Sequence, residues 1–378
     1  MAPRGVTCVG YGDPADPRVW SGTPAAVVGA LKAAECSVVT VNALTPSRVA
    51  KLGQLVVNAA FWRSSDFRRG PFARARAAAR ARRGIDAAGN DHVLHFSVNH
   101  LPLAERRPNE RHYLYLDFTY DVRLGLDAGL DGGRALSRFE ARVDALDRAA
   151  YAQIDHFFAV SRYIRRNLIE RHGIAADKIT VVGTGLGSGF LKSEVADKDY
   201  GSGEILFSSK MIDVWTQKGG PLLLDGFALA RRQNPALHLS LVGHDDYSRL
   251  AAGADGVSAY GYVTWDELVE LFRRAALFAM PALQEPWGLV YLEALACRTP
   301  VLGLDRLAFP EISGDGAFGF ICPAATPESV AATLLDAMSS PARLAEMGAR
   351  GQRHVRENFS WPRTAAKLVD VMFASAAR

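Results

Sequence analysis

The most informative segment of this 378-residue chain is Pro281-Ala282-Leu283-Gln284-Glu285-Pro286-Trp287-Gly288-Leu289-Val290-Tyr291-Leu292-Glu293-Ala294. It predicts a strand that ends near Pro281, a short loop, and a helix that begins near Gly288, with Pro286 in or just before the first turn. The unpaired N–H groups at such a helix start suit a phosphate. Glu285 precedes the helix start and Glu293 lies about a turn and a half inside the helix. The segment therefore offers a phosphate site with one carboxylate on each side for hydroxyl groups.

Short apolar runs alternate with longer amphipathic stretches on both sides of this segment. The runs are continuously apolar, which is typical of parallel strands covered on both faces. The expected strands are Val6–Gly10, Val38–Val41, Val93–Phe96, Tyr113–Leu116, Phe157–Ser161, Ile179–Val182, Ile205–Ser208, Leu237–Val242, Leu277–Met280, Val301–Leu304 and Gly319–Cys322. Between them, Leu136–Ala150 repeats its apolar residues at helical spacing. The alternation predicts an α/β protein with right-handed βαβ units and doubly wound sheets.

The length favours two domains, and the glycine-crowded segment Thr184–Gly203 has the composition of a linker between them. We expect residues 1–186 with 361–378 to form one Rossmann-like domain, and residues 190–358 to form the other. The final helix, Arg363–Phe373, would pack back on the first domain. Because ligands bind outside the carboxyl ends of the strands in open α/β sheets, a cleft between the two domains is the expected site.

The composition is that of an ordinary globular protein, with 49% hydrophobic and 22% charged residues and a formal net charge of only +4. No apolar run reaches the ~20 residues of a membrane span, and Met1–Gly12 lacks the apolar core of a secretory signal. The four cysteines are scattered, without metal or disulfide spacing, and Asp245-Asp246 is not a metal motif. We therefore expect a cytoplasmic, metal-independent protein that does not bind nucleic acid.

The excess positive charge is concentrated in the segment Phe61–Arg83, where eight arginines face one anion, Asp66, for a local charge of +7. The arginines that would share one face of a helix are Arg69, Arg76, Arg80 and Arg83. One interpretation is peripheral contact with an anionic membrane, at its inner face. The other is an ordinary solvated basic helix.

A second candidate phosphate site follows the strand Ile205–Ser208. Lys210 lies in the loop after this strand, and Lys218 lies just before a helix expected over Pro221–Arg231. Two cations beside a helix N-terminus suit a diphosphate leaving group.

Together these motifs resemble glycosyltransferase family 4, also called glycosyl transferases group 1. Glu285 and Glu293, with seven residues between them, match its E-x7-E motif, and Gly261-Tyr262-Val263 and Pro300-Val301 agree with the surroundings. The resemblance is dense from Ser161 to the C-terminus and sparser before it. It implies the GT-B fold, with two facing Rossmann-like domains around a cleft.

The resemblance also implies roles for individual residues. Glu285 would contact hydroxyls of the donor sugar, the Leu289 and Val290 amides would meet the diphosphate, and Glu293 would bind the ribose. The complete implied donor set is Gly22, Thr23, Lys210, Lys218, Gly243, Tyr262, Val263, Gly288, Leu289, Val290 and Glu293. Lys210 departs from the family, which usually has an arginine there, and a lysine gives no planar bidentate clamp.

The acceptor side is less well defined. Members of the family often carry His-x-His after the third strand, but Ser97 occupies the second position here. His95, His100 and Asp117 are therefore candidates for handling the acceptor proton, and Glu285 completes the set of candidate catalytic residues. For each of these residues a structural role, such as capping a turn, is the alternative.

The expected function is a retaining transfer of a sugar from a nucleotide-diphosphate sugar to a hydroxyl of a glycan, lipid or small-molecule acceptor, without a cofactor, by a hexosyltransferase-type enzyme. One alternative keeps the fold and changes the reaction, to a phosphorylase or a sugar-nucleotide epimerase. The other alternative is a non-catalytic anion-binding or membrane-binding module that uses the arginine segment.

Overall fold

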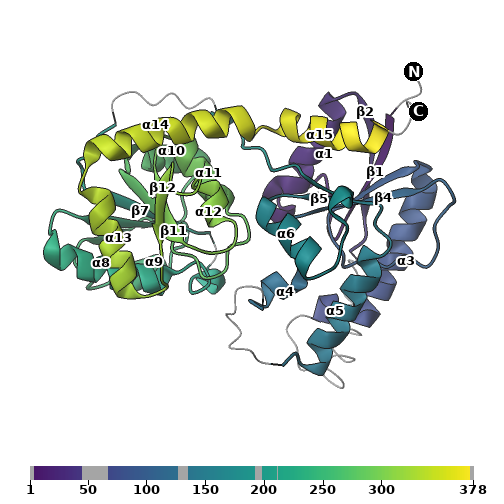
Figure 1. Cartoon of the computed structure of the whole chain (residues 1–378), viewed down its shortest axis with the longest axis horizontal. Helices are drawn as coiled ribbons and strands as arrows, with labels where there is room; N and C mark the ends of the chain where they lie inside the picture. Colours follow the sequence, from purple (N-terminus) through teal and green to yellow (C-terminus); the bar gives the residue numbers. More distant parts are fainter. Residues whose placement is uncertain (1–3, 45–66, 127–134, 192–197, 211, 375–378) are drawn as a thin grey trace. The chain divides into compact units, whose positions relative to one another are not determined.

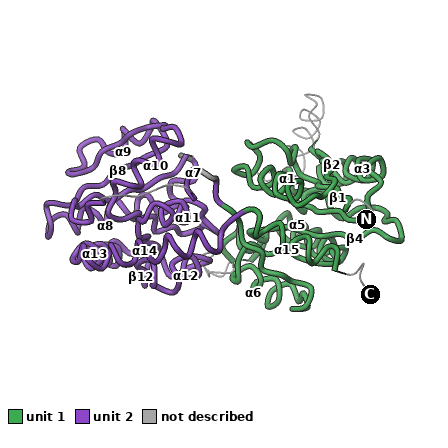
Figure 2. Tube along the Cα trace, turned by 90° about the horizontal axis from the view of Figure 1, so that it is seen from above, with its two compact units in different colours: residues 1–185, 361–378 green, residues 186–360 purple. Residues whose placement is uncertain are grey.

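The computed structural model describes residues 4–44, 67–126, 135–191, 198–210 and 212–374. The chain divides into two compact units (Figure 2): residues 1–185 with 361–378 form unit 1, and residues 186–360 form unit 2. Each unit has one six-stranded sheet covered by helices (Figure 1). The α/β class expected from the sequence is therefore confirmed.

The sheet of unit 1 has the strand order β2-β1-β3-β4-β5-β6, and all neighbouring strands are parallel. Its strands are β1 (Arg4–Gly10), β2 (Cys36–Asn42), β3 (His92–His95), β4 (Arg111–Leu116), β5 (His156–Ala159) and β6 (Ile179–Val181). The direction in which the sheet grows reverses between β1 and β3. Loops that follow these two strands meet at such a switch point, which is where open α/β sheets bind ligands.

Two pairs of helices pack on this sheet: α1 with α15, and α3 with α5. Because right-handed crossovers that run in opposite directions along a sheet place their helices on opposite faces, α1 and α3 cover different faces. The helices of unit 1 are α1 (Thr23–Ala33), α3 (Pro71–Ala88), α4 (Tyr120–Arg123), α5 (Arg138–Tyr151), α6 (Arg162–Glu170) and α15 (Trp361–Phe373). The last helix of the chain thus belongs to the first unit.

The sheet of unit 2 is also fully parallel, in the order β12-β11-β10-β7-β8-β9. Its strands are β7 (Glu204–Ser208), β8 (His238–Val242), β9 (Val257–Ala259), β10 (Leu277–Ala279), β11 (Val301–Leu304) and β12 (Gly319–Cys322). The growth direction reverses between β7 and β10. These two strands pair with each other, although about 70 residues separate them in sequence.

Helices again pack in pairs on unit 2, α8 with α13 and α11 with α14. The helices are α7 (Ser188–Leu191), α8 (Gly220–Gln233), α9 (Tyr247–Ala251), α10 (Trp265–Arg274), α11 (Leu289–Ala296), α12 (Phe309–Ile312), α13 (Pro327–Met338) and α14 (Pro341–Asn358). None of the helices that the structure describes, in either unit, has the length and apolarity needed to cross a membrane.

Each expected strand overlaps an observed one, and within the described ranges the sequence missed only β9. This strand has three half-buried residues, Val257-Ser258-Ala259, at the edge of the sheet. An edge strand this short needs no continuous apolar run, so it leaves little pattern in the sequence.

Candidate functional site

The central feature of unit 2 is an ion pair between Lys218 and Glu285, whose Nζ and Oε2 atoms lie 3.0 Å apart. Lys218 belongs to the loop after β7, and Glu285 belongs to the loop after β10. Because β7 and β10 are neighbours, both loops leave the same edge of the sheet. The side chains of both residues retain about a fifth of their exposure, so the pair is accessible to a ligand.

Backbone contacts hold the two loops together. The amides of Leu283 and Gln284 donate to the Gln217 carbonyl at 2.8 and 3.0 Å. Gly219 has φ 76°, and a Cβ there would lie only 1.9 Å from the Pro281 carbonyl oxygen. Only glycine adopts this conformation with no side chain to clash, so the close approach of the loops depends on it. The loops therefore place Lys218 against Glu285 before any ligand arrives.

Helix α11 begins at the same edge of the sheet, with Gly288 as its N-cap at φ 80°. The Tyr291 hydroxyl donates to the Met280 carbonyl at 2.5 Å, which ties the first turn to the end of β10. Leu289 and Val290 are the first two residues of the helix, where N–H groups have no partner within the helix. The positive end of the helix dipole and these amides favour an anion here.

Glu293 lies one turn further along α11 and is half-buried. Burial raises the pKa of its carboxyl to about 7, against the opposing attraction of Lys210 and Lys218. Near neutral pH the group therefore exists in both protonation states, so that it can donate as well as accept hydrogen bonds. Lys210 and Lys218 are the cations whose charges lower the pKa of this carboxyl, against the larger effect of burial.

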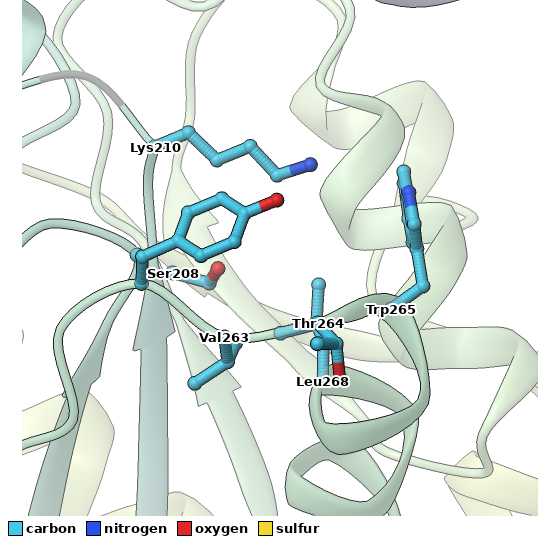
Figure 3. Close-up of a pocket in the computed structure, with 8 residues that line it drawn as sticks. Ser208, Lys210, Val263, Thr264, Trp265 and Leu268 are labelled. Atoms are coloured by element: carbon cyan, nitrogen blue, oxygen red, sulfur yellow. The ribbon is translucent and has the colours of Figure 1, made fainter.

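A small pocket lies beside Lys210 (Figure 3). Its lining residues are Ser208, Lys210, Gly243, Tyr262, Val263, Thr264, Trp265 and Leu268. The Gly243 amide donates to the Gly261 carbonyl at 2.7 Å, which joins the loop after β8 to the loop after β9. Four of the residues predicted for the donor, Lys210, Gly243, Tyr262 and Val263, thus line one pocket.

Two residues of this region, Trp265 and Asp245, are not among those predicted from the sequence. Trp265 is 55% exposed and lines the pocket, and Asp245 accepts the Tyr262 amide at 3.2 Å. The sequence feature that could have drawn attention to Trp265 is its place directly after Thr264, which forms a capping box with Glu267. A large aromatic residue at such a helix start is a candidate for contact with a ligand. The sequence suggested no role for Asp245 beyond the excluded one of a metal ligand. In the structure its carboxylate holds the loop that carries Tyr262.

In unit 1, the loop before α1 has three consecutive residues with left-handed backbone conformations: Trp20 (φ 45°), Ser21 (φ 52°) and Gly22 (φ 81°). Non-glycine residues in this region are strained, and such strain is concentrated at functional sites. The Trp20 indole N–H donates to the Asp117 carboxylate at 3.1 Å, so this loop and the end of β4 meet. Gly22 is the N-cap of α1, and Thr23, its first residue, is buried.

His95 and His100 lie elsewhere, inside a buried chain of hydrogen bonds. His95 Nδ1 is 2.8 Å from His100 Nε2, and His95 Nε2 is 2.9 Å from His112 Nδ1. His112 Nε2 in turn lies 3.1 Å from the buried Glu110, which Arg82 and Arg107 also bind. Neither ring of the two candidate residues is exposed to solvent. This geometry does not support His95 or His100 as the group that takes a proton from an acceptor, because neither ring reaches the surface of unit 1.

The chain of histidines makes unit 1 sensitive to acid. Burial lowers the pKa of His95, His100 and His112, for His100 to about 3, whereas unfolded histidines take up protons near pH 6.5. Below about pH 6.5 the unfolded chain therefore binds more protons, and stability falls as the pH is lowered. From pH 7.5 to 5.5 we expect a loss of about 1.4 kcal/mol in the free energy of unfolding for each fully buried ring.

Urea unfolding followed by circular dichroism at the two pH values measures this loss. His100→Gln should reduce the difference by roughly one ring's share. A difference between pH 7.5 and 5.5 that is as large in His100→Gln as in the unaltered protein would contradict the assignment of this ring as buried and neutral.

The arginine segment does not form the single basic face expected from the sequence. Arg69 lies in a short 3-10 helix (Phe67–Arg69) before α3, so it does not share a helical face with Arg76, Arg80 and Arg83. Two arginines instead turn inward: Arg74 pairs with the buried Asp147, and Arg82 pairs with Glu110. Membrane contact through Arg76, Arg80 and Arg83 stays a prediction, and the part of the segment before residue 67 lies outside the described residues.

The structure thus brings Lys218 and Glu285 into contact, and the charges of Lys210 and Lys218 act on the carboxyl of Glu293. Within the described part of the chain, His, Cys, Asp and Glu side chains form no group suited to hold a metal ion.

Two family models match this chain, one in each half of the sequence. The model of glycosyl transferases group 1 matches residues 201–354, and the model of glycosyltransferase family 4 matches residues 26–186. D-inositol 3-phosphate glycosyltransferase of Segniliparus rotundus is 28% identical over 235 residues, 58% of this chain and 52% of that protein. The chain spans about half the length, or less, of the curated relatives it matches.

Solved structures show the same architecture. Sucrose-phosphate synthase from Thermosynechococcus elongatus has a TM-score of 0.68 at 14% identity and covers 99% of both chains. Anabaena Alr3699/HepE in complex with UDP has a TM-score of 0.66 at 14% identity, over 98% of this chain and all of the other. The two-unit α/β chain therefore has the GT-B fold.

Proposed function

This chain belongs to the glycosyltransferases of family 4, and we propose that it moves a sugar from a nucleotide-diphosphate sugar to a hydroxyl group of an acceptor, with retention at the anomeric carbon. The observation that carries the proposal is the Lys218–Glu285 pair at the topological switch point of unit 2, beside the start of α11. A cation, a carboxylate and a helix N-terminus lie at one edge of the sheet. The cation and the helix N-terminus suit the diphosphate of a nucleotide sugar, and the carboxylate suits the hydroxyls of its sugar.

Each group has a chemical task in this proposal. Lys218, Lys210 and the first amides of α11 bind the diphosphate, and they stabilise the negative charge that develops on it as the glycosidic bond breaks. Glu285 accepts hydrogen bonds from hydroxyls of the transferred sugar and so fixes its orientation. Glu293, with its pKa raised to about 7, suits the neighbouring hydroxyls of a ribose, because its two protonation states allow it to donate or accept.

Retention and the nucleotide belong to the proposal as well. Support for a nucleotide donor comes from the similar fold of HepE, which was solved with UDP. The D-inositol 3-phosphate glycosyltransferases that this chain resembles make a small phosphorylated polyol one acceptor class to assay. Nuclear magnetic resonance of the product, which reports the configuration at the anomeric carbon, tests retention directly.

A thermal-shift screen against UDP-, GDP-, ADP- and dTDP-sugars tests the proposal. A ligand at a hundred times its dissociation constant adds about 2.7 kcal/mol of stability, which corresponds to a rise of about 5 to 10 °C for a unit of this size. We expect such a rise with at least one nucleotide sugar and none with the free sugar. No shift with any member of the panel would contradict the proposed function.

A further inference from the structure

Lys210 is held by an aromatic ring. Its Nζ atom lies 4.2 Å from the centroid of the Trp265 ring, within the range of a cation–π interaction. Figure 3 shows the Lys210 side chain extending toward Trp265, and both residues line the pocket. The lysine is exposed, and its contact with the ring limits the conformations of its flexible four-carbon stem.

The ring itself is fixed by the fold. Trp265 is the first residue of α10, and the helix start is closed by a capping box between Thr264 and Glu267. The Glu267 amide donates to the Thr264 hydroxyl at 3.3 Å, and the Thr264 amide donates to the Glu267 carboxylate at 2.7 Å. The buried Phe190 lies edge-on to the indole, with the ring centroids 5.5 Å apart. Trp265 therefore has fixed neighbours and does not depend on Lys210 for its position.

We propose that Trp265 is a positioning residue, which holds the Lys210 ammonium at the pocket in the place where it meets the diphosphate. This inference rests on the proposed function. A planar guanidinium brings two hydrogen-bond donors in a rigid fork, whereas a lysine loses much rotational freedom when it binds. The tryptophan removes part of that freedom in advance, so that less is lost on binding. Trp265 thus restricts the conformations of Lys210, whereas the guanidinium of an arginine is already rigid.

A different role for the exposed ring would be direct stacking on the nucleotide base, since Tyr262 also lines this pocket and is 69% exposed. The two roles differ in what they require. If Trp265 positions Lys210, its effect is on the binding of phosphates. It then strengthens the binding of a ligand that has no base, and this effect is lost when Lys210 is removed. Stacking needs the base and is independent of the lysine.

The test is a double-mutant cycle of Trp265→Leu and Lys210→Met, read by calorimetric binding at low salt. The probes are UDP, GDP, ADP and dTDP, of which the one that binds the unaltered protein is carried forward, and inorganic pyrophosphate, which has no base. Trp265→Leu should weaken both the nucleotide and pyrophosphate about two- to five-fold. In the Lys210→Met background the same change should have no further effect. Trp265→Phe keeps a ring face and should bind nearly as the unaltered protein does.

Three results would overturn the inference: no loss in Trp265→Leu, an equal loss in the Lys210→Met background, or a loss confined to the nucleotide. Circular dichroism checks the fold of each variant, and Trp265→Met replaces Trp265→Leu if the latter does not fold. Absence of binding by the unaltered protein to every nucleotide would instead reject the proposed function, and the inference with it.

Discussion

Glu285→Gln should lower the rate of sugar transfer by at least about 100-fold and leave the fold intact. The carboxylate is the group that orients the transferred sugar in the proposed mechanism, and an amide is a weaker acceptor for its hydroxyls. The ion pair with Lys218 is partly exposed, so its loss should change the free energy of unfolding by no more than about 1 kcal/mol. The measurement is turnover with the donor found by the thermal-shift screen, together with urea unfolding.

Glu270→Gln is the matched control. Glu270 also pairs with a cation in unit 2, Arg273 at 2.7 Å, but on the exposed surface of α10. Its variant should transfer sugar at the normal rate. If Glu285→Gln turns over as fast as this control, Glu285 does not hold the sugar and the donor assignment fails.

Lys218→Met should reduce kcat by about 100- to 1000-fold, because it removes one preorganised charge from the departing diphosphate. Lys218→Arg should recover only part of this loss, since a guanidinium differs in shape and the loop around Gly219 leaves little room for adjustment. Single-turnover kinetics separates this effect on bond cleavage from one on donor binding. Arg343→Met, which breaks the exposed ion pair with Asp336, is the control and should leave kcat unchanged.

Glu285→Gln and Lys218→Met, combined in a double variant, also distinguish the roles of the two residues in the ion pair. If Glu285 did no more than hold Lys218 in place, the double variant would be no slower than Lys218→Met alone. Under the proposal the double variant is slower than either single variant, because the carboxylate binds the sugar and the ammonium binds the diphosphate. An equal rate for Lys218→Met and the double variant would reduce Glu285 to a positioning residue.

The histidines show which part of the candidate site the sequence could not place: His95 and His100 are buried, so their predicted role in proton transfer gains no support from the structure. His95 and His100 are candidates because members of the family often carry His-x-His after the third strand, and Ser97 occupies the second of these positions here. The position of a residue at a strand end predicts roughly where the residue lies, but not the direction in which its side chain points. Both rings are buried in unit 1, where His95 is hydrogen-bonded to His100 and to His112, which lies at the start of the next strand. Asp117, which follows β4 in the same way, is instead half-exposed and bound to the strained Trp20 loop.

The sequence likewise does not predict which arginines of the arginine segment are solvated and which are buried. The composition of this segment predicted a helix, and α3 begins at Pro71, but composition could not say which arginines were solvated. Arg74 is buried because Asp147, more than 70 residues later, neutralises it from the neighbouring helix α5. A buried charge requires a partner, and that partner is visible only after the helices have packed.

The α/β class, the membership of family 4 and the start of a helix between Glu285 and Glu293 could all be predicted from the amino-acid sequence alone. These follow from local patterns, because apolar runs, helix-start residues and glycines report on the few residues around them. Three features became visible only in the folded protein: the Lys218–Glu285 pair, the contact of Lys210 with Trp265, and the burial of the histidines. The Lys218–Glu285 pair joins loops that follow strands distant in sequence. These loops meet because the growth of the sheet of unit 2 reverses between β7 and β10, and strand order is a property of the whole sheet.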